Sequence, residues 1–79
     1  PVPPGEQDFL DAERVRSSQP LRARTLYERA ARFGHPRTQA TLGMMLFSDG
    51  NRTGALRWLK AASDQGEPRG MLLWGTALF

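Results

Sequence analysis

Apolar positions recur at helical spacing along most of this chain. The clearest stripe lies in residues 21–33, where they fall at i, i+3, i+4, i+7 and i+8: Ala23, Leu26, Tyr27, Ala30 and Ala31. Such a stripe is typical of an amphipathic helix, and Gly34 follows as a C-terminal cap. Similar spacing, with prolines suited to first turns, predicts further helices over residues 6–16, 36–47, 52–65 and 68–79. The pattern therefore predicts an all-α fold.

The two ends of the chain differ from the amphipathic helices between them. Residues 1–5 read Pro-Val-Pro-Pro-Gly, the composition of a flexible linker, which leaves residues 6–79 as one domain. The helix predicted over 68–79 is apolar nearly all round, and such a helix needs cover on more than one side. We therefore expect a further helix or another chain to cover this end, with self-association as one way of meeting that need.

Two segments of the chain repeat each other at a constant offset. Gly34 corresponds to Gly66, and Gly43 corresponds to Gly75, each 32 positions apart. A period of this size is the length of one helix-turn-helix unit. Stacked units of this kind expose extended surfaces, so an interaction surface is expected in preference to an active site.

The residues within each unit resemble a known repeat family. One copy carries Ala55, Trp58, Leu59, Ala61, Ala62, Gly66 and Gly75, and the other carries Ala23, Leu26, Tyr27, Ala30, Gly34, Leu42 and Gly43. The pattern is similar to the Sel1-like repeat, a relative of the tetratricopeptide repeat. The resemblance implies a short right-handed α-α solenoid of about two and a half helical hairpins. Leu26 departs from it where tryptophan is usual, and residues 6–16 form a divergent first helix.

Small residues of the pattern have a physical role that does not depend on the family. They let the backbones of crossing helices approach closely, and larger side chains fill the remaining volume. The small residues are Ala23, Ala30, Ala55, Ala62, Gly43 and Gly75; the larger ones are Tyr27, Trp58, Leu59, Leu42 and Leu46. A change of Gly75 to leucine is accordingly expected to overpack the interface.

The resemblance also implies a function and a surface. It implies a non-enzymatic scaffold or adaptor that binds a partner protein or peptide on the concave face lined by the first helix of each hairpin. The exposed residues of that face would be Arg37, Ala40, Met44, Phe47, Arg69, Leu72, Thr76 and Phe79. Arg37 and Arg69 would form a cationic ladder beside apolar anchors for an acidic segment. Alternatively, Met44 and Phe47 are core between repeats.

Composition adds few chemical candidates. The chain has 79 residues, no cysteine and a single histidine, His35, at a helix N-cap position. The acids Glu6, Asp8, Asp11 and Glu13 suit the first turns of a solvated helix. Phosphate-loop and nucleophile-elbow motifs are missing, and no apolar stretch is long enough to span a bilayer. We predict no catalytic, cofactor or metal site and no membrane span.

Charge leaves one further class of function open. The formal net charge is +3, and six arginines against one acid fall between residues 14 and 32: Arg14, Arg16, Arg22, Arg24, Arg29 and Arg32. A basic surface of this kind suits an RNA-binding helical repeat. A third possibility is that the repeats brace a catalytic domain outside this chain. The resemblance is compatible with a bacterial regulatory or envelope protein, in the periplasm or in the cytoplasm.

Overall fold

Five α-helices make up the part of the chain that the computed structural model describes, residues 5–77. They are α1 (Glu6–Val15), α2 (Pro20–Arg32), α3 (Pro36–Ser48), α4 (Arg52–Asp64) and α5 (Pro68–Ala77). The all-α prediction is confirmed, and the predicted helix ends within this range agree to one residue. Residues 1–4 of the expected linker, and Leu78 and Phe79, lie outside the described residues. None of the five helices is long and apolar enough to cross a membrane.

Helix starts repeat with the predicted period. Helices α2 and α4 begin 32 positions apart, and so do α3 and α5. The backbone N–H of Thr38 donates to the His35 Nδ1 at 3.3 Å, which caps α3. At the equivalent place in α5, the N–H of Gly70 donates to the Glu67 Oε1 at 2.7 Å. Two different side chains thus satisfy the same free backbone donor. The expectation that His35 occupies an N-cap is confirmed.

Helix ends repeat as well. Gly34 and Gly66 both adopt the left-handed conformation, with φ of 87° and 80°. The N–H of the next residue then donates to the carbonyl of Ala30 at 3.2 Å and to that of Ala62 at 3.1 Å. These are the bonds of a Schellman motif, which satisfies carbonyls that the helix leaves free. The backbone caps that end α2 and α4 therefore recur 32 positions apart.

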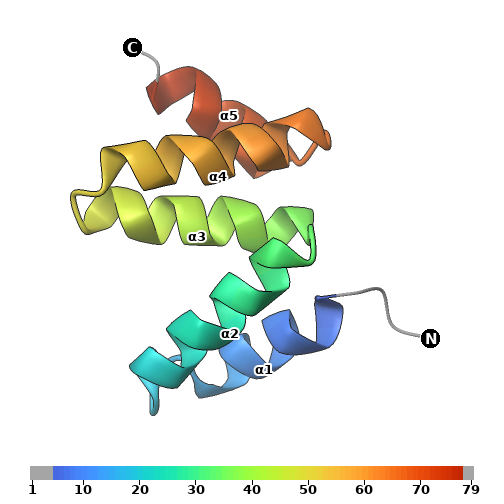
Figure 1. The fold of residues 1–79 in the computed structure, drawn as a ribbon, viewed down its shortest axis with the longest axis vertical. Helices are drawn as coiled ribbons and strands as arrows, with labels where there is room; N and C mark the ends of the chain where they lie inside the picture. The colour runs from blue at the N-terminus through green and yellow to red at the C-terminus, as the bar shows by residue number, and fades with distance from the viewer. Residues whose placement is uncertain (1–4, 78–79) are drawn as a thin grey trace.

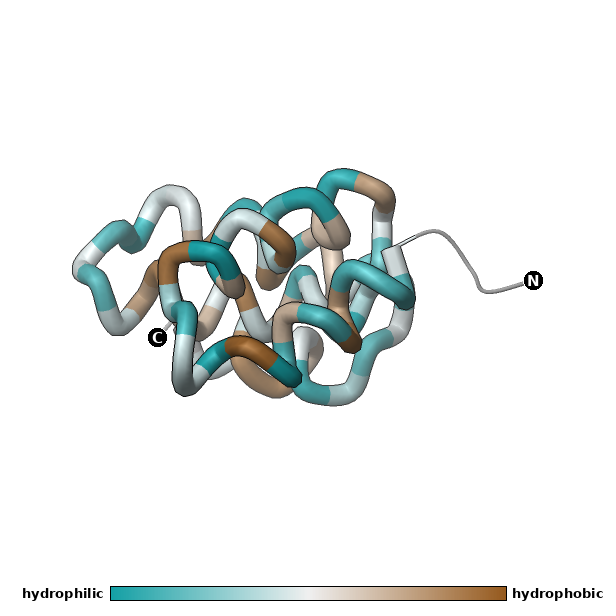
Figure 2. The backbone as a smooth tube through the Cα atoms, turned by 90° about the horizontal axis from the view of Figure 1, so that it is seen from below, coloured by the Kyte–Doolittle hydropathy of each residue, from teal (hydrophilic) through white to brown (hydrophobic). Residues whose placement is uncertain are grey.

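The helices stack in order along the chain. Helices α1 and α2 form one antiparallel pair, and α3 and α4 form a second pair that crosses the first at a steep angle (Figure 1). Helix α5 packs on α4, also contacts α3, and lies at the end of the stack farthest from α1. Hydrophobic and hydrophilic stretches alternate along the backbone (Figure 2), the pattern expected of helices that are apolar on one side.

The interior is built from small residues around a few large ones, as the sequence predicts. Tyr27, Leu42 and Leu59 are each 1% exposed, and the four alanines at the crossings are buried: Ala23, Ala30, Ala55 and Ala62. Helices α3 and α4 approach each other closely at Gly43. A Cβ built on Gly43 would lie 2.7 Å from the Cγ and Cδ2 of Leu59. Glycine at position 43 is therefore a packing requirement.

Two glycines depart from the expectation. Nothing lies within 4 Å of a Cβ built on Gly75, so the expected overpacking by leucine at that position is wrong for this fold. The reason is that Gly43 faces α4, whereas no described helix follows α5. Gly5 was expected to belong to the linker. Instead it adopts φ 87°, and a Cβ there would approach the Ala30 carbonyl oxygen at 2.9 Å, so it packs against α2.

A single aromatic side chain anchors α1. Phe9 is 3% exposed, and its ring centroid lies 6.1 Å from that of Tyr27 and 5.2 Å from that of His35. The guanidinium of Arg37 lies 5.1 Å from the same centroid and makes a cation–π contact. Phe9 therefore joins α1 to α2 and to the start of α3.

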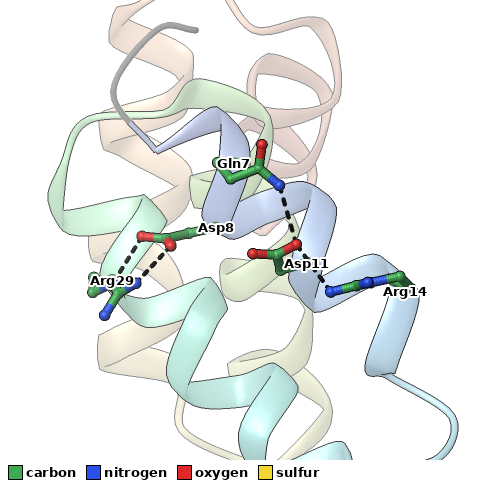
Figure 3. A network of polar contacts seen from close by, with 5 residues as sticks. All are labelled: Gln7, Asp8, Asp11, Arg14 and Arg29. Carbon is green, nitrogen blue, oxygen red and sulfur yellow. Dashed lines mark hydrogen bonds and ion pairs between the residues drawn. The ribbon is translucent and has the colours of Figure 1, made fainter.

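Three of the four acids of α1 (Glu6, Asp8 and Glu13) contact residues outside this helix, so the expectation of a merely solvated acidic face is wrong. Arg29 of α2 donates through Nε and Nη2 to both carboxylate oxygens of Asp8, each at 2.8 Å (Figure 3). This bidentate bond holds the pKa of Asp8 below its ordinary value. In the same first turn of α1, a carboxylate oxygen of Glu6 lies 2.9 Å from the Nε2 of His35.

Candidate functional site

A pocket of about 180 Å³ opens on the face shared by α1, α3 and α5. Its lining comes from these three helices, each of which the sequence identifies as the first helix of a hairpin: Glu13, Arg16, Thr41, Met44, Met45, Ser48 and Arg69. The two second helices, α2 and α4, contribute no lining residue. The pocket therefore marks a surface that exists only when three helices from different parts of the chain are stacked.

One wall of the pocket is a carboxylate that is already engaged. The hydroxyl of the buried Tyr27 donates to Glu13 Oε2 at 2.6 Å, and Arg16 Nη1 donates to the same oxygen at 3.0 Å. Burial of the phenol, together with its hydrogen bond to Glu13, raises the pKa of Tyr27 to about 12. Glu13 is thus a structural link between α1 and α2 as well as part of the pocket rim.

The Tyr27 hydroxyl makes the fold sensitive to alkali. Unfolded chains lose this proton near the ordinary pKa of 10.0, whereas the folded chain retains it up to about pH 12. The stabilisation is therefore complete below pH 10 and is lost as the pH rises toward 12, and we expect a loss of about 2 kcal/mol in unfolding free energy over that range. Urea unfolding at pH 9 and at pH 11.5 measures this difference in unfolding free energy.

Tyr27→Phe is the control, because the chain contains no other tyrosine. It should be less stable than the parent at pH 9 and lose less stability on going to pH 11.5. The only lysine, Lys60, forms an ion pair with Asp64 in which both side chains are exposed, so this pair contributes little to stability. Equal alkaline losses in the parent and in Tyr27→Phe would contradict the assignment.

The opposite wall carries an available positive charge. Arg69 Nη2 lies 2.9 Å from the sulfur of Met44, and the side chain is exposed. Within residues 5–77 Arg69 forms no ion pair with a carboxylate. A guanidinium held beside a thioether can bind a carboxylate or phosphate while apolar groups pack on the methionines.

The structure brings together only part of the surface expected from the sequence. Of the eight residues, Met44 and Arg69 line the pocket, while Arg37, Phe47, Leu72 and Thr76 are exposed outside its lining. Ala40 is 0% exposed, so the expectation that it presents itself to a partner is wrong. Phe79 lies outside the described residues. Met44 is 38% exposed and Phe47 40% exposed, so neither is fully buried core.

Sequence reasoning missed five lining residues: Glu13, Arg16, Thr41, Met45 and Ser48. A signal for four of them was present, because Glu13 and Met45 are 32 positions apart, as are Arg16 and Ser48. The first member of each pair lies on α1 or directly after it, and the second lies on α3. The signal was missed because the pattern of α1 diverges from that of α3, so the repeat was traced only from residue 21 onward.

Most of the basic surface is neutralised. Four of the six arginines between residues 14 and 32 form ion pairs: Arg14 with Asp11, Arg16 with Glu13, Arg24 with Asp49 and Arg29 with Asp8. The Arg14 pair belongs to the polar network of α1 in Figure 3. Paired arginines release fewer counterions on binding a polyanion, which weakens the argument for nucleic acid.

Groups of acids and histidine are likewise tied to structural partners. Among residues 5–77, no three side chains of histidine, aspartate or glutamate gather closely enough to hold a metal ion. In the same range, every buried side-chain nitrogen or oxygen has a hydrogen-bond partner. Gln39 illustrates this, because its Nε2 donates to the Ala31 carbonyl at 3.1 Å and its Oε1 accepts from Gln65 at 2.9 Å.

Comparison of the chain with models of protein families, with curated proteins and with solved structures finds no match in any of the three.

Proposed function

We propose that this chain is a non-enzymatic interaction module, a short right-handed α-α solenoid of about two and a half Sel1-like hairpins, which binds a segment of a partner protein. Support for the repeat comes from the helix starts, N-caps and C-caps that recur 32 positions apart. Support for an interaction role comes from the surface, since α1, α3 and α5 together line one open pocket.

The observation that carries the proposal is the exposed Arg69 beside Met44. This arginine has no carboxylate partner within residues 5–77, and the α3 side of the lining offers two thioethers and two hydroxyls. A peptide with a carboxylate near an apolar side chain matches that pattern: the carboxylate pairs with the guanidinium, and the apolar group packs on the methionines. The cationic ladder of Arg37 and Arg69 is retained only in part, because Arg37 lies against Phe9 and does not line the pocket.

An array of short peptides that combine one or two acids with one large apolar residue tests the proposal. We expect a subset of the peptides to bind. We expect Arg69→Glu to weaken binding of that subset by about tenfold or more, because the new carboxylate would repel the carboxylate of the peptide within the interface. Arg57→Glu is the matched control. It changes the net charge equally, but Arg57 is exposed on α4 and does not line the pocket.

Equal losses in the two variants would mean that binding is non-specific electrostatic attraction, which would contradict the proposal. A preference of the chain for single-stranded RNA over every peptide, with a steep salt dependence, would favour the alternative of an RNA-binding repeat. Both measurements use fluorescence anisotropy of labelled ligands.

A further inference from the structure

The face of α5 that corresponds to the α4-covered face of α3 is open. In α3, Gln39 is 5% exposed, Leu42 is 1% exposed and Gly43 is buried. These positions pack against α4 and the residues that follow it, through Leu59 over Gly43 and Gln65 bonded to Gln39. Because α3 and α5 begin 32 positions apart and are capped at the same backbone donor, the corresponding residues of α5 are Met71, Trp74 and Gly75.

Those three residues are apolar and have no comparable cover among the described residues. Met71 is 52% exposed, Trp74 is half-buried, and a Cβ on Gly75 would meet nothing within 4 Å. The neighbouring Leu72 is 70% exposed, whereas its equivalent, Ala40, is 0% exposed. A large aromatic, a methionine and a leucine beside a glycine form a typical helix-accepting surface, because the glycine allows a second backbone to approach closely. We define Met71, Leu72, Trp74 and Gly75 as the α5 face.

The chain itself specifies what fits this face. Helix α4 carries a buried stripe of one leucine flanked by two alanines: Ala55 and Ala62 are 0% exposed and Leu59 is 1% exposed. Leu59 and the Ala55 carbonyl lie over Gly43 of α3, and Ala62 lies against Gly70 of α5. The opposite side of α4 is polar and includes the exposed ion pair of Lys60 with Asp64. An occupant of the α5 face therefore needs an alanine, a leucine four residues later and an alanine three residues after that, on an otherwise polar helix.

We infer that the α5 face binds an amphipathic helix of a partner protein that carries this Ala-x3-Leu-x2-Ala spacing. Neither helix of the chain that carries a similar stripe is free to serve as the occupant for a second copy, because the stripes of α2 and α4 are buried in their own fold. The α5 face lies on residues that do not line the pocket, so this site is separate from the one proposed above. It adds a second partner contact of a different chemistry, apolar and helical.

The probe for the test is a peptide with the chain's own α4 sequence, residues 51–66, labelled at its N-terminus. A side-chain lactam between Lys60 and Asp64 holds the peptide helical on its solvent-facing side, so that failure to bind cannot be ascribed to an unfolded peptide. Fluorescence anisotropy with the 79-residue chain measures binding. We expect saturable binding that a Leu59→Ala peptide weakens by about tenfold, because leucine is the central anchor.

Gly75→Leu in the protein is the decisive variant. It fills the position over which the peptide leucine would lie, yet it meets nothing in the chain's own fold, so circular dichroism and the unfolding midpoint should stay near those of the parent. We expect Gly75→Leu to weaken peptide binding by about tenfold or more. Arg69→Glu, which affects the pocket, should leave it unchanged, and this separates a failure of one proposal from a failure of the other.

Three results would overturn the inference. The first is the absence of saturable binding by the lactam peptide. The second is equal binding by Gly75→Leu and by the parent chain, which would place the peptide on another surface. The third is a dimer, measured by light scattering, that Gly75→Leu converts to a monomer, which would make a second copy the occupant of the α5 face.

Discussion

Replacing Gly43 with leucine is expected to lower the free energy of unfolding by about 3 kcal/mol, because overpacking a close helix crossing forces backbones apart. The first added carbon would lie 2.7 Å from two atoms of Leu59 and 3.3 Å from the Ala55 carbonyl oxygen. The gain in helix propensity on removing a glycine, about 1 kcal/mol, opposes this cost but does not cancel it. Urea unfolding followed by circular dichroism at 222 nm measures the difference.

Gly75→Leu provides the matched control for Gly43→Leu. It makes the same substitution at the equivalent position of α5, where a Cβ meets nothing within 4 Å. Only the propensity gain remains, so we expect stability equal to that of the parent or slightly above it. A similar loss at both positions would mean that α5 packs against something at Gly75, and the interpretation of its open face would be wrong.

Replacing Phe9 with alanine is expected to cost about 4 kcal/mol, the usual cost of removing a buried aromatic ring. Phe9 is 3% exposed and contacts the rings of Tyr27 and His35 together with the guanidinium of Arg37. For a domain of this size such a loss is a large fraction of the total stability. Without the ring, the apolar packing of α1 is reduced to that of Ala12 and Val15, so its amides should lose protection from hydrogen exchange first.

Phe9→Leu serves as the control, because it keeps most of the apolar volume and loses the aromatic contacts. We expect a cost below about 1.5 kcal/mol. Both tryptophans of the chain, Trp58 and Trp74, lie in α4 and α5, so their fluorescence reports the end of the stack opposite α1. If Phe9→Ala leaves the tryptophan transition unchanged while hydrogen exchange in α1 accelerates, the first hairpin unfolds separately from the second. Unchanged protection of α1 would contradict the anchoring role of Phe9.

The candidate surface could be predicted from the sequence only in part. The sequence predicts the three helices that line the pocket, and of the eight residues expected on the surface, Met44 and Arg69 belong to its lining. Glu13 was missed because its role depends on Tyr27, which is 14 positions away and becomes its hydrogen-bond donor only when α1 and α2 pack together. The expectation that Ala40 is exposed rests on alignment with the repeat pattern. Such an alignment gives the side of the helix on which a residue lies, but not which other helix covers that side.

The sequence by itself determined the helices and their ends, because these depend on interactions within a few residues. Glycine adopts the left-handed conformation after α2, α3 and α4. At the start of α3, α4 and α5, a side chain accepts a hydrogen bond from the backbone N–H three residues later and so caps the helix. Only the tertiary structure decided which of two equivalent positions is buried. Gly43 and Gly75 have the same place in the repeat, yet one lies against Leu59 and the other lies in open space. The physical reason is that capping is local, whereas burial depends on neighbours contributed by other helices, and α5 has fewer of them than α3.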